Sequence, residues 1–303
     1  MSEFIGQATS VESFGAVMGM AASGDKPNFR PYEARPEGTP RDVFITSWAK
    51  SGTTMMQQMF HQIRTAHEGG DMDFDDISRV VPWEDTAYML DFDMTAPQRA
   101  APRGFKSHRE YERLPAGERY VVTLRDPKET YVSLYRFFNG WQLKRDSVSM
   151  EDFWPLWLRG GPGGCDYATH LLSWYARRSE PDTLLLNYRW AAKNREAAIR
   201  RMAAFIGVEL TPAAEALVLD RTSRDFMVEH KDRFDDAMMC AVLEAKCGIA
   251  ADADSSKVQA AGSRSDALPA SVGEKIDALW AERIAPATGH ADYAALAAEI
   301  EGL

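Results

Sequence analysis

The residues with the clearest chemical potential in this chain are Lys50-Ser51-Gly52-Thr53-Thr54, a cation and three hydroxyl groups around a glycine. Residues 42–46 before them are mostly apolar or β-branched, and residues 55–64 after them carry Met, Phe and Ile at helical spacing. Where a strand turns into a helix, free backbone N–H groups and the helix dipole converge on one point and favour a bound anion. Gly52 allows close approach of the backbone, and Lys50 adds a mobile positive charge. The segment therefore predicts a cradle for a phosphate or sulfate group, with an ordinary strand-to-helix turn as the alternative.

The order of residues in this turn differs from that of a nucleoside-triphosphate P-loop. The P-loop reads G-x-x-x-x-G-K-[ST], whereas here Lys50 precedes Gly52 and Ser47 occupies the position of the first glycine. The lysine would therefore reach the bound group from the strand side. The hydroxyl that normally holds Mg²⁺ is also out of place. We accordingly predict an anion site in which the protein holds no metal ion.

Polar side chains also stand where other predicted strands end. Lys106 and His108 end one apolar run, Arg125 ends the next, and Ser133 lies two helical turns further on. Because the carboxyl ends of parallel strands share one edge, where open α/β folds bind ligands, we expect these side chains to lie near Lys50. Taken singly, each also fits a structural role: a hydrogen-bonded histidine, an arginine at a strand end and a surface serine.

Strands and helices alternate along most of the chain. Residues 104–108, 119–124 and 183–187 are short apolar runs that predict strands. The helix after the second run has a clear start, with Asp126 as N-cap, proline at the first position and glutamate at the third. The pattern predicts an α/β fold, in which helices flank a central parallel β-sheet.

A single domain accounts for nearly all of the chain. We place it at residues 42–303, after an N-terminal lead-in at residues 1–41 that is rich in Gly, Pro and Ser towards its end. Residues 69–102 lack periodicity and predict a long irregular insertion, of the kind that often forms a substrate wall.

Composition excludes several classes of function. Of the 303 residues, 45% are hydrophobic and 26% are charged, so a large core is expected. The net charge of −10 argues against nucleic acid as a partner, since phosphate backbones need a basic face. No apolar run is long enough to cross a membrane, and the N-terminus lacks the pattern of a secretory signal. Three cysteines without metal-binding spacing indicate reduced thiols and a cytoplasmic setting.

With these elements in order, the chain resembles the cytosolic-type sulfotransferases, which transfer a sulfuryl group from 3′-phosphoadenosine 5′-phosphosulfate (PAPS). The family's loop Y-P-K-S-G-T-T-W is similar to residues 48–55 here. Its K-T-H segment resembles Lys106-Ser107-His108, and its Arg followed eight residues later by Ser resembles Arg125 and Ser133. Its Tyr-Glu-Asp strand end and its Thr-Ser-Phe segment resemble Tyr188-Arg189-Trp190 and Thr222-Ser223-Arg224. The likeness spans residues 42–285 and implies the sulfotransferase fold.

The resemblance implies PAPS as cofactor, adenosine 3′,5′-bisphosphate (PAP) as product and a small-molecule alcohol or phenol as acceptor. His108 would then be the general base that takes the acceptor's proton. Lys50 would neutralise the oxygen between sulfate and 5′-phosphate, and Lys106 would stabilise the sulfuryl oxygens. Residues implied to bind the cofactor are Lys50, Ser51, Gly52, Thr53 and Thr54 at the 5′-phosphate, Arg125 and Ser133 at the 3′-phosphate, and also Tyr188, Thr222, Lys257 and Gly262.

Several positions depart from the family's pattern. The adenine-stacking Trp of the loop is Met55 here, and the Phe of the Thr-Ser-Phe segment is Arg224. The family's late R-K-G-x-x-G-D-W segment, which binds the 3′-phosphate, is reduced to Lys257 and Gly262. Its dimerisation motif is not recognisable, so we predict no oligomeric state. Aromatic residues in segments that would line an acceptor pocket are Trp83, Tyr88, Phe92, Phe137, Phe138, Trp141, Phe153, Trp154 and Trp157.

Two other functions stay open at this point. A P-loop-like kinase using ATP to phosphorylate a small molecule would need a carboxylate that holds Mg²⁺ at a strand end, and Asp126 is the obvious candidate. A non-catalytic nucleotide-binding relative would fit the altered adenine contacts.

Overall fold

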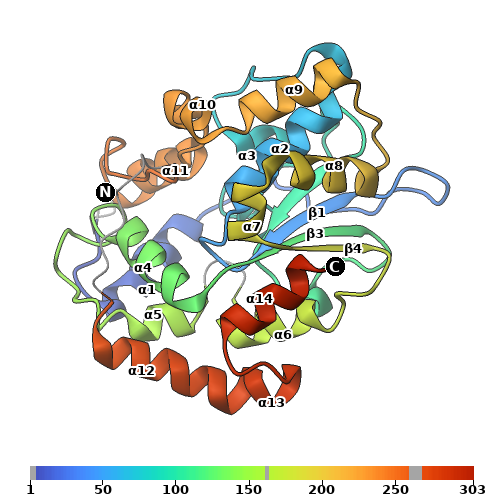
Figure 1. Cartoon of the computed structure of the whole chain (residues 1–303). Coiled ribbons are helices and arrows are strands. Elements are labelled where there is room, and N and C mark those ends of the chain that lie inside the picture. The colour runs from blue at the N-terminus through green and yellow to red at the C-terminus, as the bar shows by residue number, and fades with distance from the viewer. Residues whose placement is uncertain (1–4, 161–163, 259–267) are drawn as a thin grey trace.

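A parallel β-sheet forms the centre of the computed structural model, which describes residues 5–160, 164–258 and 268–303. In these residues the sheet has four strands in the order β2-β1-β3-β4 (Figure 1). The strands are β1 (Val43–Ser47), β2 (Gly104–Ser107), β3 (Arg119–Leu124) and β4 (Thr183–Asn187). In the register, Val43 pairs with Gly104 on one side and with Arg119 on the other. The predicted α/β class and the central parallel sheet are therefore confirmed.

Alternate residues of the strands pack against helices on opposite faces of the sheet. Val43 and Ile45 of β1 join a core with α2 (Thr53–Thr65), α8 (Arg195–Ile206) and α9 (Pro212–Arg221). Phe44, which points the other way, joins a larger core with residues of α6 (Tyr167–Tyr175) and α14 (Tyr293–Glu301). Figure 1 shows these two groups of helices above and below the sheet. Covering both faces explains why the strands are buried along nearly their whole length.

The remaining described helices complete the two layers. They are α1 (Val11–Ala22), α3 (Ile77–Val80), α4 (Pro127–Phe138), α5 (Trp154–Leu158), α7 (Tyr188–Lys193), α10 (Arg224–Glu229), α11 (Ala237–Cys247), α12 (Ala270–Leu279) and α13 (Ala285–Thr288), with a π-helical segment at Trp280–Ile284 between α12 and α13. Among the described residues, no helix has the length and apolarity that a membrane span requires.

The start of α4 follows the sequence closely. The Asp126 side chain accepts hydrogen bonds from the backbone N–H groups of Lys128, at 2.7 Å, and Glu129, and proline stands at the first helical position. This confirms Asp126 as an N-cap. Both hydrogen bonds go to Oδ1, so one carboxylate oxygen is committed to the first turn of the helix, which disfavours the Mg²⁺ ligand that a kinase would need.

The N-terminal lead-in contains a helix that packs onto the main body. Ser10 caps α1, and Val17 and Ala21 of this helix are fully buried in the larger core. The Cys247 thiol of α11 donates to the Val17 carbonyl at 3.4 Å, and the Ala8 N–H donates to the Gln142 carbonyl at 2.9 Å. These contacts hold α1 beside the segments that follow α4, close to the candidate site.

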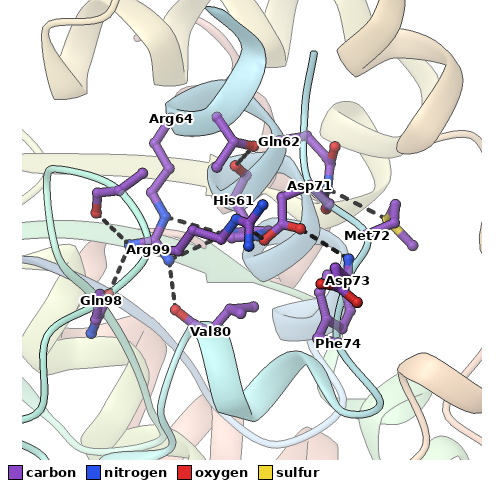
Figure 2. Close-up of polar contacts among 12 residues, drawn as sticks. His61, Gln62, Arg64, Asp71, Met72, Asp73, Phe74, Val80, Gln98 and Arg99 are labelled. Atoms are coloured by element: carbon purple, nitrogen blue, oxygen red, sulfur yellow. Dashed lines mark hydrogen bonds and ion pairs between the residues drawn. The ribbon is translucent and has the colours of Figure 1, made fainter. Parts of the chain in front are cut away.

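A buried polar cluster fastens the 69–102 insertion to α2 (Figure 2). His61 lies at its centre, donating from Nε2 to Asp71 at 2.9 Å and accepting at Nδ1 from Arg64 Nε at 3.2 Å. Arg99 pairs with the same Asp71 oxygen at 3.0 Å. Arg64 also donates to the Gln98 side chain at 2.7 Å. The cluster therefore anchors both ends of the insertion to the helix that begins at the predicted anion cradle.

The cluster predicts an acid-sensitive stability. Burial, aided by the neighbouring Arg64 charge, lowers the pKa of His61 from 6.5 to about 4. Since the unfolded chain gains a proton near pH 6.5 and the folded chain only near pH 4, stability is complete above pH 6.5 and falls as the pH drops towards 4, by about 3 kcal/mol. Urea unfolding at a series of pH values should show this fall. In His61→Gln the decline over the same window should be shallower; equal slopes in both proteins would contradict the assignment.

Candidate active site

A cavity of about 1230 Å³ opens at the carboxyl ends of the strands. It brings together most of the residues singled out in the sequence, namely Lys50, Gly52, Thr53, Thr54, Lys106, His108, Arg125, Ser133, Tyr188, Thr222 and Lys257. Met55 and Arg224, where the chain departs from the family's pattern, line the same cavity. Ser51 is buried and does not line it, and Gly262 lies outside the described residues.

Charge distinguishes this cavity from the rest of the molecule. Among the described residues, eleven lysine and arginine residues line it, against three aspartate and glutamate residues. The chain as a whole has a net charge of −10. An acidic protein that gathers its cations around one cavity favours an anionic ligand there.

The turn after β1 has the backbone geometry of an anion cradle. Lys50 and Gly52 both adopt the left-handed region, with φ of 67° and 95°. A Cβ at Gly52 would lie 2.1 Å from the Tyr188 ring, so only glycine fits between the turn and that ring. The Ser51 N–H already donates to the Trp48 carbonyl at 3.1 Å, so the phosphate contact implied for it competes with this bond. The Thr53 hydroxyl is hydrogen-bonded to that of Ser47.

Two lysines in the cavity are buried against aromatic rings. Lys50 Nζ lies 4.0 Å from the centre of the Phe137 ring, and Lys106 Nζ lies 3.3 Å from that of Trp83. Burial first, and then the charge of Lys257, lowers the pKa of each from 10.5 to about 7. Both ammonium groups are therefore only partly protonated at neutral pH, and a bound anion would raise both pKa values.

His108 is held in one orientation at the end of β2. Its Nδ1 lies 2.6 Å from the Ser47 carbonyl oxygen, so Nδ1 carries the proton and Nε2 is the basic nitrogen. Burial, together with the Lys106 charge, keeps the pKa of His108 well below 6.5. The imidazole is therefore neutral at physiological pH, the state in which Nε2 can accept a proton.

Asp85 supports His108 and was not singled out in the sequence. Its carboxylate is fully buried and accepts from the His108 N–H at 2.7 Å, the Ser107 hydroxyl at 3.0 Å and the Trp83 indole at 2.8 Å. It thereby joins the insertion to the end of β2. Its place beside Trp83 in an aperiodic segment gave no signal, because only the fold brings it to His108.

Arg125 links the ends of three strands. Its Nη1 donates to the Lys50 carbonyl at 2.8 Å, and its Nε donates to Glu129 at 2.9 Å. The guanidinium carbon lies 4.9 Å from the centre of the Tyr188 ring, which follows β4. Thr222, which the resemblance also implied as a cofactor-binding residue, already has a partner for its hydroxyl, which donates to the Val218 carbonyl at 2.8 Å.

Lys257 lines the cavity that Arg125 and Ser133 also line. The resemblance implied that it is a remnant of a 3′-phosphate segment. Its ammonium is paired with Asp236 and lies 5.7 Å from the centre of the Trp83 ring. It therefore belongs to the group around Lys50 and Lys106, whose pKa values it lowers.

Aromatic side chains line part of the cavity. Of the nine aromatic residues proposed for an acceptor pocket, Trp83, Phe137, Phe138 and Trp141 line it. Phe153 and Trp157 are fully buried in the core, Tyr88 is 52% exposed, and Phe92 and Trp154 do not line the cavity either. Phe14 and Met18 of α1 contribute to the wall and were missed, because α1 belongs to the lead-in.

Comparison with known proteins places this geometry in a family. Residues 40–256 match the family described as sulfotransferase domain. Sulfotransferase 2A1 of Macaca fascicularis is 24% identical over 198 residues, which are 63% of this chain and 67% of that protein. The amine sulfotransferase of Oryctolagus cuniculus is 26% identical over 176 residues, 56% of this chain and 57% of that protein. The chain thus spans roughly three fifths to two thirds of these relatives' length.

Solved structures share the fold. Retinol dehydratase in complex with androsterone and the inactive cofactor PAP superposes with a TM-score of 0.62 at 17% identity, covering 81% of each chain. Mouse sulfotransferase SULT7A1 complexed with PAP gives a TM-score of 0.60 at 18% identity, covering 97% of this chain and 94% of that one. The fold and the family expected from the sequence are therefore both confirmed: this chain belongs to the sulfotransferase domain family.

Proposed function

We propose that this protein transfers a sulfuryl group from PAPS to the hydroxyl group of a small apolar alcohol or phenol. The observation that carries the proposal is the placing of three separate elements around one cavity. They are the anion cradle with Lys50, the neutral imidazole of His108 and the guanidinium of Arg125. Two of the fold's solved representatives are complexes with PAP, which supports the choice of donor.

The residues present suit such a donor. Its phosphates would meet a cavity rich in lysine and arginine residues, and the close approach that Gly52 allows is what a phosphate in the cradle needs. Gly52, Thr53 and Thr54 would hold the 5′-phosphate, and Arg125 with Ser133 the 3′-phosphate. When bound, PAPS supplies the activated sulfuryl group.

Each reactive side chain then has a defined task. His108 accepts the acceptor's hydroxyl proton at Nε2 while the acceptor oxygen forms its bond to sulfur. Lys50 neutralises the charge that develops on the 5′-phosphate oxygen as the old bond to sulfur breaks, and Lys106 stabilises the sulfuryl oxygens. The Ser47 carbonyl keeps the imidazole oriented throughout, and Asp85 holds the backbone N–H of His108.

The acceptor end of the cavity favours an apolar molecule. Phe137, Phe138 and Trp141 line the cavity together with Phe14 and Met18 of α1, and the rings of Phe14 and Phe138 pack with their centres 5.1 Å apart. His108 lines the same cavity. Retinol dehydratase, a fold neighbour, has been solved with androsterone and with retinol, both apolar alcohols. We propose an acceptor of this chemistry, with one hydroxyl group directed at His108.

Thermal unfolding with different nucleotides tests the donor assignment. PAP should raise the melting temperature in a concentration-dependent way without Mg²⁺, and ATP with Mg²⁺ should raise it much less at the same concentration. A larger shift with ATP and Mg²⁺ would favour the kinase and overturn the proposal. No shift with PAP at millimolar concentration would also overturn it.

The two buried lysines predict how PAP affinity depends on pH. Because the pKa values of Lys50 and Lys106 are about 7 in the free protein and rise when an anion binds, binding takes up protons. Affinity should therefore be highest below pH 7 and fall as the pH rises from 7 to 9, by at most about tenfold per unit for each lysine. Isothermal titration calorimetry in buffers of different ionisation enthalpy measures the uptake. Lys50→Met should reduce the number of protons taken up on binding. A PAP affinity of the wild type that does not change with pH would contradict the prediction.

A further inference from the structure

Glu129 joins two arginines at one end of the cavity. It lies in the first turn of α4, and each of its carboxylate oxygens pairs with a different guanidinium. Oε2 accepts from Arg125 Nε at 2.9 Å, and Oε1 accepts from Arg189 of α7. All three side chains line the cavity. A carboxylate has thus been placed where the proposed function needs to bind a phosphate.

The helical spacing places this trio beside Ser133. Glu129 and Ser133 are four residues apart on α4 and therefore project from the same face. Ser133 also lines the cavity, and together with Arg125 it forms the 3′-phosphate position of the proposed function. The Glu129 carboxylate consequently lies next to that position rather than at a distant part of the wall.

Charge decides what Arg189 does there. The charges of Arg125 and Glu129 alone sum to zero, so this pair offers little attraction to a doubly charged phosphate. Arg189 brings the trio to a net charge of +1. Its side chain is 63% exposed, so it retains N–H groups that can reach a ligand in addition to those facing Glu129.

The base of Arg189 is well fixed although its tip is exposed. The Asn187 side chain caps α7 by accepting from the Arg189 N–H at 2.8 Å. The preceding residue, Tyr188, packs on Gly52 and beneath Arg125, so α7 is tied to the cradle. In the sequence pattern that this strand end resembles, the residue after Tyr is Glu, so the charge at this position is reversed here.

We propose that Arg189, held beside Arg125 by Glu129, is a second cation of the 3′-phosphate position and makes the protein select adenosine bisphosphates over monophosphates. The proposal rests on the proposed function, because it assumes that a 3′-phosphate occupies this end of the cavity. Arg189 binds the ligand directly. Glu129 is a positioning residue that aligns the two guanidinium groups for it.

Calorimetric titration with two nucleotides tests the role of Arg189. PAP and adenosine 5′-phosphate differ in the 3′-phosphate alone, so the ratio of their dissociation constants reports on that group. At one fixed ionic strength, Arg189→Ala should weaken PAP binding about tenfold to a hundredfold and change adenosine 5′-phosphate binding by less than about twofold. Arg189→Lys should recover part of the loss, because it restores the charge without the planar fork.

Arg200→Ala is the matched control. Arg200 is likewise about 62% exposed and likewise pairs with two carboxylates, Glu196 and Glu215, but it does not line the cavity. Its variant should bind both nucleotides as the wild type does. Unchanged PAP affinity in Arg189→Ala would show that Arg189 forms only a surface ion pair. Equal weakening of the binding of both nucleotides would show that Arg189 does not act on the 3′-phosphate. Either result overturns this inference and leaves the proposed function standing. A wild type that fails to bind PAP overturns the proposed function with it.

Discussion

Replacing Lys50 with alanine should lower kcat for sulfuryl transfer by roughly a hundredfold to a thousandfold. The ammonium is buried in the cavity beside the cradle, where the proposed function has it neutralise charge on the oxygen that the sulfuryl group leaves. In a site of low polarity, a charge placed in advance for the transition state contributes far more than it would in water. Steady-state kinetics with PAPS and a phenolic acceptor measure the loss.

Comparing the loss of kcat with the loss of PAP affinity makes this test specific. PAP affinity of Lys50→Ala at pH 7 should fall much less than kcat, because Gly52, Thr53 and Thr54 still hold the 5′-phosphate and Lys50 is only partly charged there. Lys144→Ala, which removes an exposed lysine outside the cavity, is the control and should behave as the wild type. An unchanged kcat in Lys50→Ala, or a loss confined to PAP binding, would contradict the role given to Lys50.

His108→Ala is expected to lower kcat by about a hundredfold to ten-thousandfold while leaving PAP affinity nearly unchanged. In the proposed function the imidazole contacts the acceptor rather than the phosphates. Its Nε2 is the basic nitrogen because Nδ1 donates to the Ser47 carbonyl. Pre-steady-state or steady-state rates with saturating PAPS give kcat, and calorimetry gives PAP affinity.

Another histidine provides the control for that variant. His290 is hydrogen-bonded to Tyr175 and Glu299 and lies outside the cavity lining, so His290→Gln should keep wild-type turnover. If His108→Ala retained kcat, or if both variants lost it equally, His108 would not be the base. Since the pKa of His108 lies well below 6.5, activity of the wild type should not fall as the pH drops from 8 to 7 through protonation of this residue.

The features that could be predicted from the sequence depend on residues that are close together in the chain. The turn at Lys50 and Gly52 is recognisable because strand, glycine and helix start are contiguous in the chain, and the cap at Asp126 uses neighbours only. The parallel arrangement then brings Lys106 and Arg125 to the same edge as Lys50, since carboxyl ends of parallel strands share one side. Periodicity therefore sufficed for the sheet and for placing Lys50, Lys106 and Arg125 at one edge of it.

Contacts between distant segments explain what was missed. Asp85 reaches His108 across 23 residues of aperiodic chain, and Phe14 reaches the cavity from a lead-in with no link in sequence to α4. The contact of Lys257 with Trp83 likewise joins segments far apart in the chain. The pairing of Arg189 with Glu129 likewise depends on how α7 sits against α4, which no spacing encodes.

Transfer of radiolabelled sulfate from PAPS to a panel of apolar alcohols and phenols tests the central claim most directly. The label should appear in at least one organic acceptor with the wild-type protein, in the absence of added metal, and should be lost with Lys50→Ala and with His108→Ala. A wild-type protein that binds PAP firmly yet transfers label to no member of the panel would contradict the account and leave a nucleotide-binding relative without catalytic activity.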